Sequence, residues 1–223
     1  DSVNEVHVFE AGNRPGGHTA TVDVDHDGEQ LAIDTGFIVF NNRTYPNFIA
    51  LLQKLGIKAE PAPMSFSVSD ALSGIEYAGT SVNTLFAQSR NLLSPRFLRM
   101  VRDIMRFNRE VEGHLLRFPE TGAASVGEYL LAFGYSREFT QWYLLPMGAA
   151  IWSSSQKAME GFPLQFFVNF FRNHGLLDLH NRPQWYVIKG GSSAYIKPLV
   201  APIRDRLYLN TPVTAVSRGI WHQ

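Results

Sequence analysis

The chain has 223 residues, of which 45% are hydrophobic and 13% aromatic, enough to build the core of one large domain or two small ones. Lys plus Arg and Asp plus Glu number 20 each, so no net field draws the chain to nucleic acid or to an anionic membrane, and a small-molecule partner is expected instead. The absence of cysteine excludes disulfides, thiolate metal sites and cysteine nucleophiles.

The apolar stretches at 142–152 and 162–171 are shorter than the roughly 20 residues that cross a bilayer, so we expect no transmembrane segment. No signal peptide opens the sequence, and a reducing cytoplasm is compatible with the lack of cysteine, so we expect a cytoplasmic protein. The first residue, Asp1, stands inside a strand pattern and is not preceded by a methionine. We therefore expect a processed or truncated product.

The first sixty residues predict strands, a hairpin and a helix. Residues 3–11 (VNEVHVFEA) form a strand pattern whose nearly continuous apolar character favours burial on both faces. The runs TATVDV and QLAID flank Asp27-Gly28, a turn signal, and predict a β-hairpin. Residues 45–56 predict a helix with a proline in its first turn and a glycine at its end.

The middle of the chain predicts mainly helices. Residues 94–118 carry apolar side chains at helical spacing behind Ser94, a capping residue, and Ser125 opens a capping-box pattern before another helix. The other elements expected here are two strand-like runs within 64–78 and helices within 136–151 and 163–173.

The last forty residues return to strand and turn character. Residues 184–191 predict a strand that ends at a glycine pair. A short helix follows, capped by Ser192 or Ser193 and broken at one of the next two prolines, and residues 208–218 predict strands.

This order of elements predicts an α/β fold with a helical insertion. We expect one α/β domain built from both ends of the chain and one mainly helical domain built from the middle. The first comprises residues 1–63 and 185–223, and the second residues 64–184.

Glu10, Gly16 and Gly17 are the first candidate site. A carboxylate at the end of a parallel strand can accept both ribose hydroxyls, and adjacent glycines let backbone amides approach a phosphate. A strand end followed by an ordinary glycine turn would have the same sequence, so these residues alone leave both interpretations open.

Several segments together resemble the flavin-dependent amine oxidase superfamily. VFEAGNRPGGHTATV is similar to its second FAD fingerprint, E-A-x-x-R-x-G-G-R-x-x-T, and AIDTGFIVF resembles the D-x-G segment that follows. WYVIKGGSSAYIKPL resembles the glycine pair and helix by which the family's chain returns to the FAD domain, and LNTPVTAVSR resembles its adenine-side strand. A narrower likeness, carried by LPMGAAIWSSS and FFRNHGLL, is to bacterial predicted NAD/FAD-binding proteins with an amine oxidase domain and to the flavin-domain extension of plant cyclopropane fatty acid synthases.

The resemblance implies a role for each matching residue. Glu10 would hold the adenosine ribose, Arg14 would lie along the adenosine and pyrophosphate, and Gly16 and Gly17 would give amides to the phosphates. His18 stands where the family usually has arginine, so a phosphate contact from its side chain and a plain surface position both stay open. The other residues assigned to the cofactor are Ala11 and Thr19 in the same motif, Gly36 and Phe37 against the flavin ring, and Val213 at the adenine edge.

The resemblance also implies that the α/β domain is an incomplete Rossmann-like FAD-binding domain and that the helical domain binds the substrate. The family's first glycine loop (G-x-G-x-x-G) and its late G-D segment have no counterpart here, so we name no catalytic residue and expect that the chain does not retain FAD by itself. Strand 3–11 would then lack its inner neighbour, and pairing with a second chain, giving a homodimer, is a further expectation.

The substrate pocket is expected in the helical insertion. We assign Trp152, His174 and Trp185 to it, and other aromatic residues that could line it are Trp142, Tyr143, Phe166, Phe167 and Phe170. Aromatic residues at helical spacing are equally expected in a plain core, and His174, which precedes a glycine, is equally expected as a helix cap. The histidines lack metal-ligand spacing, so we expect no metal site.

These observations predict an FAD-dependent oxidoreductase that transfers a hydride from an apolar or amine-bearing substrate to flavin, with lipid acyl chains tried first and amines second. A non-catalytic nucleotide-binding or scaffold protein is the alternative. A dehydrogenase that uses NAD alone is disfavoured, because the double glycine after the acid is not part of the minimal dinucleotide motif.

Overall fold

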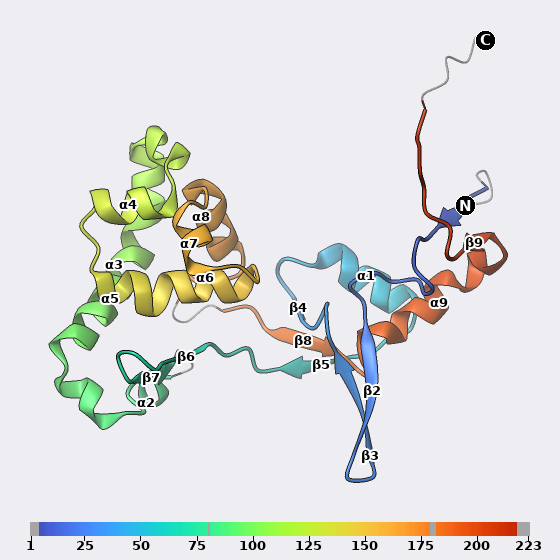
Figure 1. The fold of residues 1–223 in the computed structure, drawn as a ribbon, viewed down its shortest axis with the longest axis horizontal. Coiled ribbons are helices and arrows are strands. Elements are labelled where there is room, and N and C mark those ends of the chain that lie inside the picture. The colour runs from blue at the N-terminus through green and yellow to red at the C-terminus, as the bar shows by residue number, and fades with distance from the viewer. Residues whose placement is uncertain (1–4, 80, 179–181, 218–223) are drawn as a thin grey trace. The chain divides into compact units, whose positions relative to one another are not determined.

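The computed structural model describes residues 5–79, 81–178 and 182–217. The chain divides into two compact units, which we call unit 1 (residues 1–63 and 184–223) and unit 2 (residues 64–183). Unit 1 is therefore built from both ends of the chain, which are blue and red in Figure 1, and unit 2 from the middle, in green to orange.

Unit 1 contains three small sheets and short helices. Strands β1 and β9 pair in parallel, β2 and β3 form an antiparallel hairpin, and β4, β8 and β5 form an antiparallel sheet in that order. The elements are β1 (Val8–Phe9), β2 (Thr21–His26), β3 (Glu29–Asp34), β4 (Phe40–Asn41), α1 (Pro46–Lys54), β5 (Ala59–Ala62), β8 (Trp185–Ile188), the 3₁₀ helix η4 (Ser192–Tyr195), α9 (Ile196–Val200), the 3₁₀ helix η5 (Ala201–Arg206) and β9 (Leu207–Tyr208).

The core of unit 1 lies between the three-stranded sheet and α1. Phe40, Leu52 and Ile188 are buried there. The Phe48 ring of α1 packs edge-on against Phe40, with ring centroids 5.2 Å apart. The apolar face of α1 is thus covered by the three-stranded sheet, in which β4 precedes α1 in the chain and β5 and β8 follow it.

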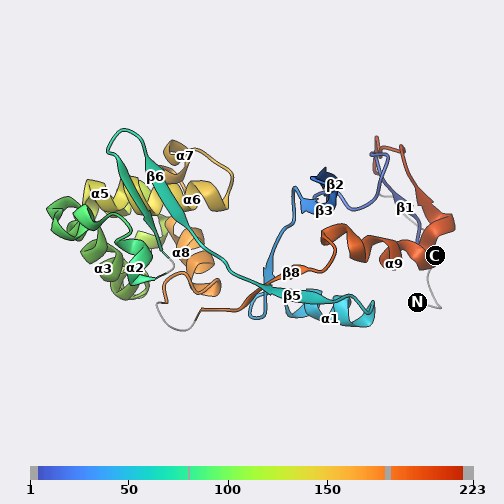
Figure 2. The same ribbon diagram turned by 90° about the horizontal axis from the view of Figure 1, so that it is seen from below.

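Unit 2 contains one hairpin and a set of helices, seen from two directions in Figures 1 and 2. The elements are β6 (Ser67–Asp70), β7 (Ile75–Ala78), α2 (Val82–Leu85), the 3₁₀ helix η1 (Ser89–Leu93), α3 (Pro95–Arg117), the 3₁₀ helix η2 (Pro119–Ala123), α4 (Val126–Ala132), α5 (Arg137–Phe139), the π-helical segment η3 (Thr140–Leu144), α6 (Leu145–Ile151), α7 (Gln156–Glu160) and α8 (Leu164–Asn173).

The long helix α3 organises unit 2, and the features predicted at its start are confirmed. The Ser94 hydroxyl accepts a hydrogen bond from the Phe97 amide at 3.3 Å, and a proline occupies the first helical position. The buried side of α3 packs into two apolar clusters of unit 2, one around Phe97 and the other around Phe107. The capping box at Ser125 is also confirmed, with both reciprocal hydrogen bonds to Glu128 present.

The π-helical segment η3 has a chemical cause. Pro146 stands four residues after Trp142, where an α-helix would donate an N–H to the Trp142 carbonyl, and proline has no N–H. The buried hydroxyl of Tyr77 donates to that carbonyl instead, at 2.5 Å. A strand residue of unit 2 thus donates to a helix carbonyl that lacks its α-helical donor.

The strands expected near the two ends of the chain are shorter in the structure than the sequence predicted, and the last helix breaks near one of its two predicted positions. Residues 3 and 4 of the strand expected at 3–11 lie outside the described residues, and within 5–11 the strand comprises Val8 and Phe9. Val6 and Phe9 are 49% and 53% exposed, so the prediction of burial on both faces was wrong. In the described part of the segment expected to form strands, residues 208–217, only Tyr208 lies in a strand, β9, where it pairs with Phe9. The last helix was expected to break at Pro198 or Pro202. It continues through Pro198 as α9, which ends at Val200, and the backbone leaves helical geometry at Ile203, directly after Pro202, so the second alternative is confirmed.

Candidate functional site

The loop that follows β1 is the candidate cofactor site. Hydrogen bonds on both sides of Glu10 fix it against the last strand, since its amide donates to the Tyr208 carbonyl (2.9 Å) and its carbonyl accepts from the Thr211 amide (2.8 Å). Its half-buried carboxylate accepts the Gly12 amide through Oε1 at 2.6 Å. Among the described residues, Oε2 has no hydrogen-bond donor, which leaves this oxygen available to a ligand hydroxyl.

Arg14 holds the glycine loop from one side. Its guanidinium donates to the carbonyls of Gly17 and Thr19, both at 3.0 Å. In a trans peptide the C=O of one residue and the N–H of the next point in opposite directions, so drawing the Gly17 carbonyl toward Arg14 turns the His18 amide away from it. Thr19 is buried, and its hydroxyl lies 2.6 Å from that of Tyr195, which fixes the end of the loop.

The backbone of this loop fits an anionic group. Gly16 and Gly17 both have positive φ, 116° and 54°, and a Cβ built on Gly17 would meet no atom within 4 Å. The amides of Gly17 and His18 donate to no acceptor within the described residues. Unpaired amides beside an open glycine are the donor set that a diphosphate requires, so these residues fit the pyrophosphate of FAD.

The other residues predicted for the cofactor have different surroundings. Ala11 and the His18 side chain are exposed. Gly36 approaches the loop so closely that a Cβ on it would lie 2.2 Å from the His18 carbonyl oxygen, and the Phe37 amide donates to that same oxygen at 2.8 Å. This close packing requires a glycine at position 36 even if no flavin lies beside it. Val213 is 64% exposed, five residues beyond the end of β9.

The carboxylate of Asp34, which sequence reasoning did not single out, connects the two parts of unit 1. It accepts hydrogen bonds from the Ser192 amide (2.8 Å), the Ser192 hydroxyl (2.9 Å) and the Thr21 hydroxyl (2.6 Å). Gly191 packs so tightly here that a Cβ would lie 2.4 Å from the Thr21 methyl group. The D-x-G and glycine-pair segments therefore meet in space, with Asp34 capping the helix that follows Gly191.

The residues predicted for the substrate pocket are only partly brought together. Trp152 and His174 both contact Phe170 of α8, with ring centroids 4.8 Å and 3.9 Å from it, and His174 is the cap residue at the end of that helix. Trp185 lies in β8 of unit 1. Trp152 and His174 thus belong to an aromatic cluster that continues the core of unit 2.

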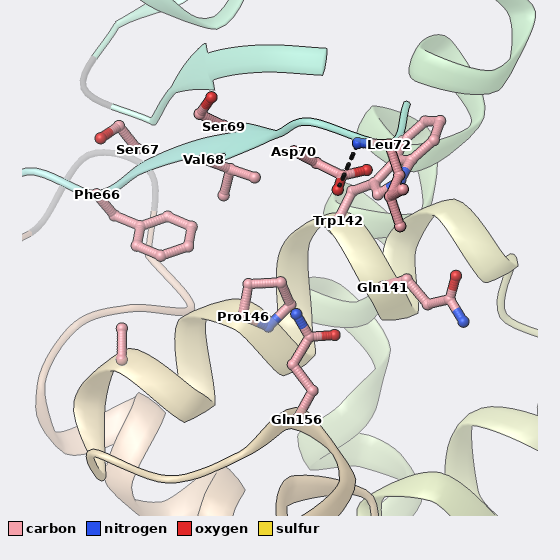
Figure 3. Close-up of a pocket in the computed structure, with 11 residues that line it drawn as sticks. Phe66, Ser67, Val68, Ser69, Asp70, Leu72, Gln141, Trp142, Pro146 and Gln156 are labelled. Carbon is pink, nitrogen blue, oxygen red and sulfur yellow. Dashed lines mark hydrogen bonds between the residues drawn. The ribbon is translucent and has the colours of Figure 1, made fainter. Parts of the chain in front are cut away.

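Each unit has a cavity, and none of Trp152, His174 and Trp185 lines either of them. The cavity of unit 2, about 450 Å³, lies against the β6–β7 hairpin and is lined in part by Trp142 (Figure 3). The cavity of unit 1, about 280 Å³, lies between α1 and the three-stranded sheet and is mostly apolar. Of the other aromatic residues expected to line a pocket, Trp142 lines the cavity of unit 2, whereas the walls of these two cavities do not include Tyr143, Phe166, Phe167 or Phe170.

Two further searches covered the described residues. No helix in this part of the chain is long and apolar enough to cross a membrane. No group of three or more histidine, aspartate or glutamate side chains within the same ranges is arranged to hold a metal ion.

Comparisons with known proteins complete the description of the site. Wild-type putrescine oxidase bound to putrescine superimposes with a TM-score of 0.58 at 19% sequence identity, over 94% of this chain and 46% of that chain. A triple mutant of putrescine oxidase, from a redesign of its cofactor binding, gives a TM-score of 0.55 at 19% identity, over 92% and 45% of the two chains. The chain thus spans less than half the length of these structures, and the likeness shows a shared mixed helix-and-strand fold.

A search of curated proteins found no match. The sequence model of the flavin containing amine oxidoreductases matches residues 4–221, which is nearly the whole chain. The order of the segments that resemble an FAD fingerprint, the fold and this match agree, and the chain belongs to the family of flavin containing amine oxidoreductases.

Proposed function

We propose that the chain forms part of an FAD-dependent oxidoreductase, with unit 1 on the cofactor side and unit 2 on the substrate side. The observation that supports this most is the loop after β1, where a carboxylate with a free oxygen and two unpaired amides face no donor or acceptor of the described protein. Ribose hydroxyls and a pyrophosphate are complementary to this set.

Within this proposal each residue of the loop has one task. Glu10 accepts a hydrogen bond from the adenosine ribose, and the amides of Gly17 and His18 donate to the pyrophosphate. Arg14 acts on the loop itself, because both of the hydrogen bonds that it makes go to loop carbonyls. When bound, the flavin supplies the hydride acceptor, and the protein supplies orientation and a water-poor surrounding.

The substrate class that we propose is an amine with an apolar body. The family match and the putrescine found in one superimposed structure both support an amine. Lipid acyl chains, which the narrower sequence resemblance favoured, have no such support. The alternative is a non-catalytic protein that only keeps the fold, and the visible spectrum distinguishes the two. A bound flavin whose colour is lost when an amine is added without oxygen indicates an enzyme, whereas a folded but colourless protein indicates the alternative.

The cofactor assignment is tested by Glu10→Gln in a full-length, flavin-loaded protein that contains this chain. The glutamine oxygen can still accept the Gly12 amide, so the loop keeps its shape, while the charged acceptor for the ribose is lost. A hydrogen bond to a charged group contributes about 1.5–3 kcal/mol, so FAD affinity should fall about tenfold or more.

The matched control is Glu29→Gln, which removes the same charge from the exposed hairpin of unit 1 and should leave FAD affinity unchanged. Equal FAD affinity of Glu10→Gln and wild type in a fluorescence titration would contradict the assignment.

A further inference from the structure

The side of α3 that faces away from the core of unit 2 combines arginines with large apolar residues. Phe97 and Phe107 mark the buried side of this helix, where they belong to the two apolar clusters. On the opposite side, residues spaced by three, four or seven positions line up along the helix. This outer stripe, which runs about 27 Å along α3, consists of Leu98, Arg102, Met105, Arg109 and Leu116.

The apolar members of the outer stripe are open to solvent. Leu116 is 84% exposed, Met105 51% and Leu98 44%. Leu93, which lies in η1 just before the helix begins, is 87% exposed. Single exposed apolar residues are ordinary on a protein surface, but a row of them along one helix face points to an interaction surface.

The arginines on and beside the outer stripe outnumber the acids that they contact. Asp103 is the acid for two of them, Arg102 at 3.3 Å and Arg106 at 4.0 Å, and Glu138 is the acid for two others. Two arginines on each carboxylate leave one positive charge uncompensated. Both carboxylates are also buried, whereas the Arg102 and Arg109 side chains are 66% and 73% exposed. An approaching partner therefore meets guanidinium groups first.

This positive charge is a local feature of α3, since basic and acidic residues are equal in number over the whole chain. The two acids beside the outer stripe, Glu110 and Glu112, are themselves paired with arginines, and the exposed Arg117 follows at the end of the helix. The helix contains no lysine. The planar fork of arginine matches the oxygens of a phosphate group through paired hydrogen bonds, which a lysine ammonium cannot do.

We propose that the outer stripe binds the surface of an anionic lipid bilayer, with α3 parallel to the membrane plane. Leu98, Met105 and Leu116 enter the boundary between headgroups and acyl chains, and the guanidinium groups donate to lipid phosphates. Nucleic acid would pair the arginines but leave the apolar side chains in water, and an apolar protein surface would leave the arginines unpaired. A bilayer surface is the partner that uses both. The stripe lies in unit 2 and needs no flavin, so its test is separate from that of the proposed oxidation.

The first test measures binding of the whole chain to vesicles by co-sedimentation. We expect vesicles of phosphatidylcholine with about one third phosphatidylglycerol to bind the chain at least tenfold more tightly than vesicles of phosphatidylcholine alone. Added salt should weaken this binding, because it screens exposed charges. Equal binding to the two kinds of vesicle, or no binding to the mixed vesicles, would overturn the proposal. Duplex DNA bound as tightly as the mixed vesicles would also overturn it, since the apolar side chains would then have no part.

The second test removes charge from the outer stripe. The double variant Arg102→Gln with Arg109→Gln should weaken binding to the mixed vesicles about tenfold or more, because each arginine at an anionic surface contributes about fivefold. The buried Asp103 keeps its contact with Arg106 in this variant. The matched control, Lys157→Gln with Arg204→Gln, removes two charges from α7 and η5 and should change binding less than about twofold.

The third test removes apolar surface at constant charge. Leu116→Ser should weaken binding to the mixed vesicles about threefold or more, and its high exposure means that the fold does not depend on it. The control is Leu72→Ser, since Leu72 is 99% exposed on the β6–β7 hairpin, which packs against the buried side of α3. This control should bind as wild type does. Unchanged binding of either stripe variant, or an equal loss in its control, would refute the assignment of the outer stripe.

Discussion

Replacing Tyr77 with phenylalanine should destabilise unit 2 through one hydrogen bond. The side chain is 3% exposed, burial raises the pKa of Tyr77 so that the hydroxyl stays a donor, and it bonds to the Trp142 carbonyl at 2.5 Å. Because Pro146 cannot donate to that carbonyl, Tyr77→Phe removes a buried hydrogen bond that the α-helical donor cannot replace, at a cost of about 1–3 kcal/mol. For a chain of this size, a loss of about 2 kcal/mol lowers the melting temperature by roughly 4–8 °C.

Two measurements separate this cause from a general loss of packing. Tyr208→Phe removes a hydroxyl that lies 3.2 Å from His7 on the exposed β1–β9 pair, and it should change the unfolding free energy by less than about 0.5 kcal/mol. In a Pro146→Ala background residue 146 regains an N–H, so Tyr77→Phe should cost about 1 kcal/mol less there than in wild type. An equal cost in both backgrounds, measured by urea unfolding, would refute the reasoning.

The remaining predictions concern backbone space and pH. Gly36→Ala should destabilise unit 1 by about 1–3 kcal/mol, because its Cβ would lie 2.2 Å from the His18 carbonyl oxygen. Gly113→Ala should stabilise α3 by about 0.5–1 kcal/mol, because a Cβ there would meet no atom within 4 Å. The urea unfolding midpoints of the two variants test both expectations. Burial alone would raise the pKa of Asp103, but hydrogen bonds from Ser136 and nearby arginines bring it below the usual value. Its contribution to stability is therefore present above about pH 4 and is lost as the pH falls below that, and Asp103→Asn should flatten this fall in midpoints measured from pH 7 to 3. A steeper fall in the variant would contradict the assignment.

The elements with local signals were predictable from the sequence. The spacing of apolar residues and the Ser94 cap predict helix α3. The pair Asp27-Gly28 predicts the β2–β3 hairpin, and both of these turn residues have the positive φ that a two-residue hairpin turn requires. The strands near the two ends were predicted too long. A strand needs a partner, and β1 finds only Leu207 and Tyr208, about two hundred residues away in the sequence.

The candidate site was predictable as a set of residues but not as a set of contacts. The acid and glycine spacing placed Glu10, Gly16 and Gly17 on one loop, as the structure has them. Two contacts depend on side-chain directions, which the spacing of residues in the sequence does not determine. They are the hydrogen bonds from Arg14 to two loop carbonyls and the hydrogen bond from Ser192 to Asp34. For the same reason, an aromatic pattern could not distinguish Trp142, which lines a cavity, from Trp152, which packs in a cluster.

The pairing of β5 with β8 has a consequence for how the chain acquires its fold. Ala62 and Trp185 are opposite each other in that antiparallel ladder, so the chain leaves unit 1 and returns to it at adjacent positions. During synthesis, the first half of unit 1 cannot complete its contacts until β8, Ser192 and β9 have been made. Unit 2 can fold as soon as it emerges, which brings residues 62 and 185 close together. Adjacent ends also make the middle segment exchangeable, because a two-residue hairpin turn joining Ala62 to Trp185 would replace it without moving either strand. A different segment could therefore be inserted into unit 1 between Ala62 and Trp185.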